Sequence, residues 1–355
     1  MLIGASIVLL IVLVLVVREL GRSGAGVPSP RRRAPARAAP VAEEESEVTR
    51  IGRDPKTAGV SAFDASAALA RMEDDREGDG DLGQSGQSAL TAFEVGAGEG
   101  LDEPTGPVEL ILVSAVAQSD VGQKRKRNED SYLVMPDHAV YVVADGMGGY
   151  AGGDVASRIA VSTIAEVVES GRFKGDPNPK RPKGGNELVW AIEAANAAVH
   201  KAAKATAEYE EMGTTLVSAR FSPKKQRVFI GHVGDSRCYR FRSAKLVQLT
   251  TDHTLAQKGV TGPYAANLSR AVGISSAAKV DLIVDAPRPQ DAYLLCSDGL
   301  SKMLTDAQIE EVLVGEPNPT ACVKKLISAA NSSGGRDNIT VILIKVDQPV
   351  AGGAF

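Results

Sequence analysis

The segment VYVVADGMGG at residues 140–149 sets a carboxylate directly after five apolar residues. A short apolar run that ends in turn-forming residues predicts a buried strand, here Val140–Ala144. Beyond a glycine-rich stretch, Asp154–Ser170 carries apolar residues at helical spacing and predicts a helix. We therefore expect Asp145 to lie at the end of a buried strand, with Gly146 permitting a sharp turn after it.

Two further acids occupy comparable places. Asp298 follows the apolar run Ala292–Cys296, and Asp337 stands just before the apolar run Ile339–Val346. The ends and starts of antiparallel strands share an edge of the sheet, so these two acids and Asp145 can converge. Converging carboxylates repel one another unless a cation neutralises them, and an all-oxygen ligand set suits Mg²⁺ or Mn²⁺. Taken singly, each Asp-Gly pair is better explained as ordinary turn chemistry.

The remaining elements are grouped by type along the chain. Strands are predicted at Val108–Val116, Thr214–Phe221, Arg227–Val233, Ala292–Cys296 and Ile339–Val346, and helices at Asn186–Tyr209, Asp306–Val314 and Thr320–Asn331. Strands follow strands and helices come in pairs, so strand and helix do not alternate regularly. This order favours an α+β domain over residues 108–347, with antiparallel sheets flanked by helices.

The overall composition excludes several classes of protein. The chain has 355 residues, 43% of them hydrophobic and 24% charged, which is near the globular average. A net charge of −4 without a sustained basic block gives no electrostatic reason to bind nucleic acid. Cys238, Cys296 and Cys322 form no C-x-x-C pair. An odd number of scattered cysteines argues against a disulfide framework or a Cys-type zinc site and favours a reducing compartment.

Other catalytic motifs are missing or fit poorly. No His is followed by Glu, no Gly is followed by Lys, and no Cys has an Arg six positions on. These absences exclude a zinc-protease helix and a P-loop, and they argue against a thiolate phosphatase loop. The segment 146–151 matches the dinucleotide-binding pattern G-x-G-x-x-A. Asp145 would lie close to the pyrophosphate, however, and Glu166 and Glu169 fall inside the predicted helix, so we disfavour that interpretation.

The N-terminal residues predict a membrane anchor over residues 1–20. Leu2–Val17 is apolar and uncharged. Sixteen residues are slightly fewer than the roughly 20 that span a bilayer, but Met1 and a snorkelling Arg18 can make up the difference. A cleaved signal peptide would carry its basic residues before the apolar run, and here they come after it. A buried core helix is the other alternative.

The residues after the apolar run predict the orientation of the anchor and a flexible tether. Arginines crowd residues 18–40, so by the positive-inside rule the rest of the chain faces the cytoplasm at the cell membrane. Residues 21–107 are rich in Pro, Ala, Gly, Ser and acids, which predicts a disordered linker. Residues 348–355 are expected to form a short tail.

Seven motifs stand in an order that is seen in metal-dependent Ser/Thr protein phosphatases. They lie at residues 125–131, 142–149 with 156–157, 213–215, 231–237, 252–253, 297–300 and 334–340. Over about 108–347 the chain resembles the type 2C (PPM) phosphatase family in its bacterial form. The resemblance implies a four-layer sandwich, in which two central antiparallel β-sheets are flanked by α-helices.

The resemblance also implies roles for the acids at the strand ends. Asp145 would bridge two Mn²⁺ or Mg²⁺ ions, with the Gly146 carbonyl on one of them. Asp298 and Asp337 would complete the shell of the other ion. In the family, a water shared between the ions attacks phosphorus without a phospho-enzyme.

Further site residues follow from the same resemblance. Glu129 and Asp130 would ligate the ions directly or through water. Asp235 matches the acid that bacterial members use, together with Asp298, for a third ion. Arg125 stands four residues before Glu129, where the family often has an arginine that binds the substrate phosphate.

This sequence departs from the family pattern at two places. Many eukaryotic members have a His directly after the Asp-Gly pair, whereas Met147 stands here, so the general acid is unassigned. His253 is expected to be structural. Only residues 254–268 separate the Asp252-His253 pair from Ser269-Arg270, which is shorter than the usual bacterial flap.

The resemblance predicts a membrane-anchored Ser/Thr protein phosphatase, a monomer that opposes Ser/Thr protein kinases. Its partners would be phosphorylated proteins, namely kinases and their substrates, and the membrane through the N-terminal helix. Two alternatives stay open. One is a catalytically weak phosphatase-like binding module, although every metal acid is present. The other is a phosphatase for small phosphate esters, or for one anti-sigma-factor antagonist, built on the same core.

Overall fold

The computed structural model describes residues 87–91, 111–148, 152–205, 207–222 and 226–348. The chain divides into two units, residues 1–60 and 61–355, and all of the described residues belong to the second. The described strands form two sheets in which neighbouring strands are antiparallel. The first sheet has the order β1 (Gln87–Thr91), β2 (Leu112–Asp120), β12 (Ile339–Asp347), β11 (Ala292–Cys296), β8 (Arg237–Arg242) and β9 (Lys245–Gln248). The second has the order β10 (Asp281–Asp285), β7 (Arg227–Val233), β6 (Leu216–Ser222), β4 (Val140–Met147) and β3 (Asp130–Met135), with β5 (Gly213–Thr214) paired to β4.

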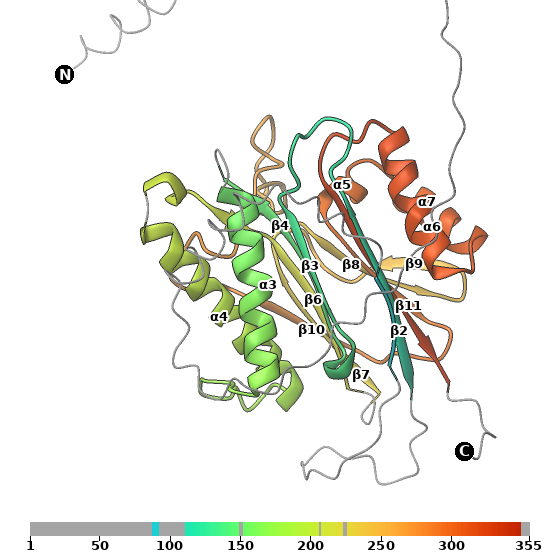
Figure 1. The fold of residues 1–355 in the computed structure, drawn as a ribbon, viewed down its shortest axis with the longest axis horizontal. Helices are drawn as coiled ribbons and strands as arrows, with labels where there is room; N and C mark the ends of the chain where they lie inside the picture. Colours follow the sequence, from blue (N-terminus) through green and yellow to red (C-terminus); the bar gives the residue numbers. More distant parts are fainter. Residues whose placement is uncertain (1–86, 92–110, 149–151, 206, 223–225, 349–355) are drawn as a thin grey trace, which may run out of the picture. The chain divides into compact units, whose positions relative to one another are not determined.

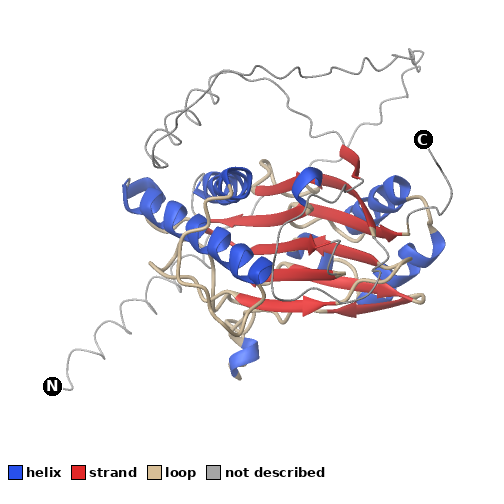
Figure 2. Ribbon diagram, turned by 90° about the horizontal axis from the view of Figure 1, so that it is seen from below, coloured by secondary structure: helices blue, strands red, loops and turns tan. Residues whose placement is uncertain are grey.

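Helices cover the outer face of each sheet, as Figures 1 and 2 show. The second sheet is covered by α3 (Gly152–Ser170) and α4 (Lys183–Ala205), and the first by α5 (Asp298–Ser301), α6 (Asp306–Gly315) and α7 (Pro319–Ser332). Short 3₁₀ turns lie at Pro136–His138, Ala207–Tyr209 and Ala256–Lys258. The predicted pair of antiparallel sheets flanked by helices is therefore confirmed.

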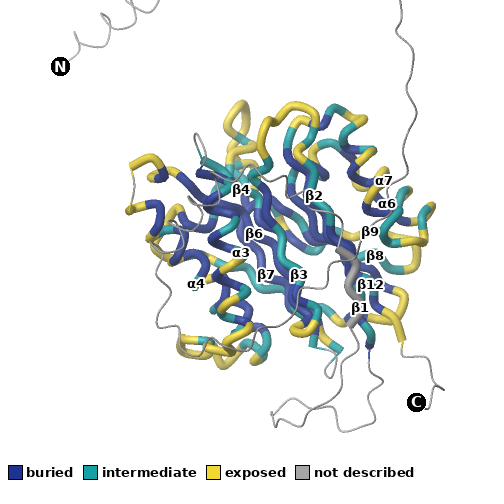
Figure 3. The backbone as a smooth tube through the Cα atoms, in the orientation of Figure 1, coloured by how far each residue is buried: buried dark blue, intermediate teal, exposed yellow. Residues whose placement is uncertain are grey.

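Burial on both faces explains why the first five residues of β4, Val140–Ala144, form an uninterrupted apolar run. Val140 and Val142 pack into the core beneath α3 and α4. Tyr141 and Val143 point the other way, into the core between the two sheets. A strand in an inner layer of a four-layer sandwich has no solvent face, so it shows no alternation of apolar and polar residues. Figure 3 shows the buried backbone concentrated in the strands between the helical layers.

Some predicted elements differ from the observed ones at their ends, and the described strands β3, β8, β9 and β10 were not predicted. The strand expected at Val108–Val116 is β2, which runs from Leu112 to Asp120. The strands at Arg227–Val233 and Ala292–Cys296 have the predicted bounds. The helix expected to end at Tyr209 ends at Ala205, before the 3₁₀ turn. The strand expected at 214–221 is divided at Thr215, because Thr214 pairs with Val272 as well as with the end of β4.

Strand β1 corrects the predicted linker. It lies inside residues 21–107, which were expected to be disordered throughout, and it pairs with the edge of β2 from Gln87 opposite Ala117 to Thr91 opposite Val113. Backbone pairing to an exposed strand edge does not depend on an apolar pattern, so composition alone could not find this strand.

The predicted anchor at 1–20, the rest of the linker apart from β1, and residues 349–355 of the predicted tail lie outside the described residues. Within the described part of the chain, no helix has the length and apolar character needed to cross a membrane.

Candidate metal centre

Asp145 lies within β4 and not at its end, which corrects the expected turn. The strand continues through Gly146 to Met147, and Gly146 pairs with Thr214 of β5. A Cβ atom on Gly146 would lie 2.0 Å from the carbonyl oxygen of Gly153 and 2.5 Å from that of Glu129. The glycine is therefore needed because the start of α3 and the residue before β3 both approach its backbone closely.

Asp298 and Asp337 lie at the same end of two neighbouring strands of the first sheet, as expected from the sequence. Asp298 is the first residue of α5, directly after β11, and Asp337 stands two residues before the neighbouring strand β12. A Cβ atom on Gly299 would lie 1.9 Å from the carbonyl oxygen of Asn338. This second Asp-Gly pair thus also uses its glycine for close approach of two backbone segments.

Asp130 connects the two sheets beneath the acids. It begins β3 opposite Asp145, and its Oδ2 accepts hydrogen bonds from Ser297 Oγ at 2.8 Å and Thr340 Oγ1 at 2.7 Å. The pKa of Asp130 is raised to about 7, first by burial and then by the nearby charges of Asp298 and Asp337, against the lowering effect of these two hydroxyls. Ser297 and Thr340 are positioning residues that the sequence analysis did not single out, although both lie within its motifs.

Glu129 is held through its backbone. Its N–H donates to Asn338 Oδ1 at 2.8 Å, and its carbonyl accepts from Gly146 N–H at 3.1 Å. Burial raises the pKa of its carboxyl. The side-chain amide of Asn338 also donates to the carbonyls of Val121 and Arg127 at 2.9 Å each, which fixes the segment that carries Glu129.

Asp145 is the centre of the negative charge. Its pKa lies well above the usual range, first because the carboxyl is withdrawn from water and then because four other carboxylates surround it. Those four belong to Asp130, Asp298, Asp235 and Asp337. The fold therefore brings these predicted acids close together, where their negative charges repel one another.

Two basic side chains divide these acids into pairs. Lys302 Nζ donates to Asp235 Oδ2 at 3.1 Å and also to Asp298 Oδ2. Arg125 donates to Asp337 Oδ2 at 2.8 Å and, at 3.5 Å, to a carboxylate oxygen of Glu129. Among the described residues, no three His, Cys, Asp or Glu side chains are already arranged to hold a metal ion. Asp235, Asp298, Asp337 and Glu129 are thus paired with cations of the protein itself.

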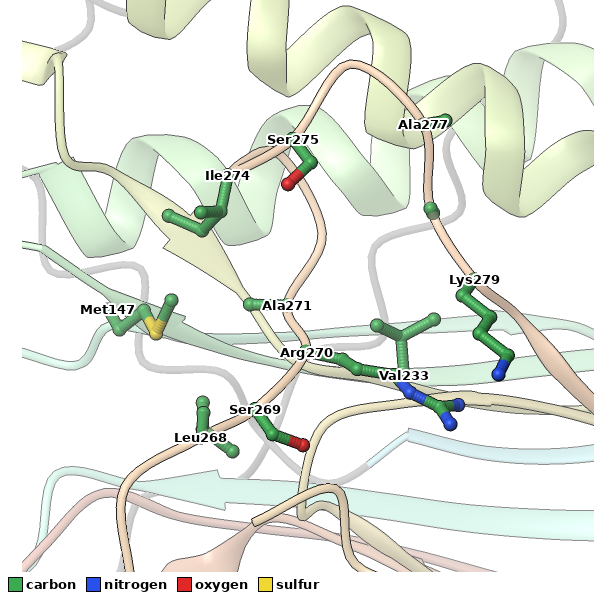
Figure 4. A pocket seen from close by; sticks show the side chains of 11 residues that line it. Met147, Val233, Leu268, Ser269, Arg270, Ala271, Ile274, Ser275, Ala277 and Lys279 are labelled. Carbon is green, nitrogen blue, oxygen red and sulfur yellow. The ribbon is translucent and has the colours of Figure 1, made fainter. Parts of the chain in front are cut away.

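A pocket of about 340 Å³ opens beside the end of β4. Figure 4 shows Met147, Leu268 and Ile274 on one side of it and the basic residues Arg270 and Lys279 on the other. The segment between β9 and β10 supplies most of the lining and has no regular secondary structure besides the 3₁₀ turn Ala256–Lys258.

His253 anchors this segment and is placed as a structural residue. Its ring is buried, its Nδ1 accepts from Gly234 N–H at 3.1 Å, and its Nε2 lies 3.1 Å from Asp281 Oδ2. Burial lowers the pKa of its imidazole. A histidine with both nitrogens engaged in this way holds the loop to the turn after β7.

The protein phosphatase 2C family model matches residues 122–335, which is well over half of the chain. The chain belongs to the protein phosphatase 2C family. The serine/threonine phosphatase stp of Listeria monocytogenes serovar 1/2a is 33% identical over 244 residues, which cover 65% of this chain and 94% of that protein. The serine/threonine protein phosphatase PstP of Mycobacterium tuberculosis is 34% identical over 268 residues, covering 70% of this chain and 49% of PstP.

A solved structure is similar to this domain as well. The catalytic domain of PstP in complex with two manganese ions superposes with a TM-score of 0.58 at 33% identity, covering 67% of this chain and all of that domain. The predicted family and the predicted enzyme class, a protein-serine/threonine phosphatase, are thereby confirmed. The dinucleotide-binding fold has a mostly parallel sheet, so the antiparallel pairing of the described strands excludes that alternative.

Proposed function

We propose that this phosphatase hydrolyses phosphoserine and phosphothreonine with a water molecule activated at a centre of two Mn²⁺ or Mg²⁺ ions. The observation that carries the proposal is the gathering of four other carboxylates around Asp145, whose own carboxyl is withdrawn from water. Such a cluster is unfavourable unless divalent cations bind to it. The two manganese ions of the PstP catalytic domain support the same assignment.

The residues present fit these ions. Asp145 would be shared between them, the Gly146 carbonyl would serve one, and Asp298 and Asp337 would serve the other. Glu129 and Asp130 would ligate directly or through water. The donors are all oxygens, which Mg²⁺ and Mn²⁺ prefer. Bound there, the ions would lower the pKa of water and stabilise the charge that develops at phosphorus.

The chain's own side chains would orient the substrate and the acids. The Arg125 guanidinium is about half exposed and already faces two of the acids, so it can turn to bind a substrate phosphate. Cys296 stands close to Asp298 in sequence, but it is fully buried and its pKa is raised by burial to about 12. A buried neutral thiol is no nucleophile, which supports direct attack by water without a covalent intermediate.

The test is phosphate release from phosphothreonine and phosphoserine peptides, compared with release from a small aryl phosphate. We expect turnover of the peptides that depends on Mn²⁺, stops with EDTA, and exceeds turnover of the aryl ester in kcat/KM. Turnover of the aryl ester alone would favour a phosphatase for small esters. No turnover of either substrate with saturating Mn²⁺ or Mg²⁺ would favour a phosphatase-like binding module.

The pH dependence of metal binding provides a second test. The pKa of Asp130 is raised to about 7, and burial also raises the pKa values of Asp145 and Glu129, so protons compete with a metal ion for these carboxylates. The apparent Kd for Mn²⁺ should therefore fall as pH rises from 5.5 to 7.5, by up to about tenfold per unit for each proton released. Titration calorimetry in buffers of different ionisation enthalpy measures the released protons. A Kd independent of pH, without proton release, would contradict the description of this centre.

We further propose that Leu2–Val17 anchors the enzyme in the cell membrane with the catalytic domain in the cytoplasm. The arginines that follow the apolar run support this orientation. Linker residues 21–86 would have a flexible reach on the order of 45 Å, which raises the effective concentration of the enzyme near membrane-bound kinases and their substrates. Protease added to intact spheroplasts should leave the phosphatase domain uncut. Its digestion, or a soluble form cleaved after about residue 20, would refute the anchor and its orientation.

A further inference from the structure

Lys302 lies between two acids of the metal centre. It caps the C-terminal end of α5, four residues after Asp298. Its Nζ donates to Asp235 Oδ2 at 3.1 Å and to Asp298 Oδ2. One ammonium group therefore bridges the two carboxylates that a third divalent ion would need.

Asp235 depends on this ammonium group for its neutralisation. Its side chain is only 6% exposed, in the turn between β7 and β8. Arg237 begins β8 two residues later, but it is turned to Asp252, donating from Nε at 2.9 Å and from Nη2 at 2.8 Å. The charge that faces Asp235 is therefore that of Lys302, and a buried carboxylate without such a partner is costly.

We propose that Lys302 replaces the third metal ion of this phosphatase, so that the centre takes two divalent ions and no more. The inference rests on the proposed two-metal function. A divalent cation between Asp235 and Asp298 needs direct contact with their oxygens, in the space where the ammonium already makes its hydrogen bonds. An ion there would have to displace Lys302 or stand against its positive charge.

The same contact gives Lys302 a positioning role. Asp298 is shared between the ammonium and the proposed metal pair, so Lys302 restrains the carboxylate that would ligate the second ion. The lysine side chain is half exposed. Substitutions at this position therefore change charge with little change in packing.

The experiment counts bound Mn²⁺ per chain by equilibrium dialysis at pH 7.5, on the full-length protein. The variants are Lys302→Met, which keeps the stem, and Lys302→Asp, which adds an oxygen donor. Lys325→Met is the matched control, because it removes a single lysine that pairs with one acid, Glu316, on the helical layer. Thermal unfolding of each variant, with and without Mn²⁺, shows that it is folded.

We expect two Mn²⁺ ions for the wild type and for Lys325→Met, and three for Lys302→Asp and Lys302→Met. Mn²⁺ should also raise the unfolding midpoint of the two Lys302 variants more than that of the wild type. Three ions in the wild type, or two in both Lys302 variants, would overturn the inference while leaving the two-metal function intact. A wild type that binds no Mn²⁺ would instead overturn the proposed function itself.

Discussion

Replacing Asp145 by asparagine is expected to lower Mn²⁺-dependent phosphate release by about three orders of magnitude or more. The charges of Asp130, Asp298, Asp235 and Asp337 all act on this side chain, which is the one proposed to be shared between the two ions. Asparagine has nearly the same shape but no charge. Steady-state kinetics on a phosphothreonine peptide over a range of Mn²⁺ concentrations measures the loss, and full activity at saturating Mn²⁺ would refute the two-metal mechanism.

The same variant should be more stable than the wild type when metal is absent. In the metal-free protein the Asp145 carboxylate is withdrawn from water and repelled by its neighbours, and asparagine removes both effects. We expect the unfolding midpoint in EDTA to rise by a few degrees, and most of the stabilisation by Mn²⁺ to disappear. Asp137→Asn is the control, because that exposed acid in the turn after β3 should change neither quantity. An Asp145→Asn protein less stable than the wild type in EDTA would show that the carboxylate serves the fold.

The sequence predicts the strands at Ala292–Cys296 and Ile339–Val346 well because burial on both faces makes them mostly apolar. Each contributes one face to the core between the sheets and the other to the core beneath α7. The strands that the analysis missed lie nearer the sheet edges. Lys245–Gln248 alternates between exposed and half-buried residues, and four residues are too few for that alternation to be recognised.

Asp145, Asp298 and Asp337 could be picked out from the sequence because each stands beside an apolar run. Glu129, Asp130 and Asp235 were predicted only from the family resemblance, and the groups that hold the acids were not predicted. The hydroxyls of Ser297 and Thr340 reach Asp130 from another sheet, and Lys302 meets Asp235 across 67 residues of chain. Such partners depend on the packing of distant segments, so periodicity and local spacing cannot identify them.

The glycines after the acids also depend on the packing of distant segments. The sequence analysis predicted that glycine is needed there, but it attributed the need to a turn. An Asp-Gly pair is typical of a turn, yet Gly146 is a strand residue whose φ is not positive. The requirement comes from the space available to a side chain, because the carbonyl oxygens of Gly153 and Glu129 occupy the position where a Cβ would lie. The two causes make different predictions for neighbouring glycines.

Gly146→Ala is expected to destabilise the protein by about 3 kcal/mol, at the upper end of what overpacking usually costs. The added Cβ meets backbone atoms of two elements at 2.0 and 2.5 Å, and neither can yield without moving α3 or the start of β3. Because Glu129 and Asp145 sit on the displaced segments, a shift on the order of 1 Å should also lower kcat/KM by about 100-fold. Urea unfolding and phosphopeptide kinetics measure the two effects.

Two further alanine variants separate the steric cause from the turn. Gly315→Ala adds a Cβ at the end of α6 that meets nothing within 4 Å, so its stability should be unchanged or slightly higher. Gly153→Ala meets the Gly146 backbone at 2.9 Å and Glu129 Oε1 at 3.0 Å, so its loss should fall between the other two. If close approach of α3 governs this corner of the site, the losses follow the order Gly146, Gly153, Gly315. A harmless Gly153→Ala beside a harmful Gly146→Ala would show instead that the approach of the Glu129 carbonyl, and not contact with α3, imposes the glycine.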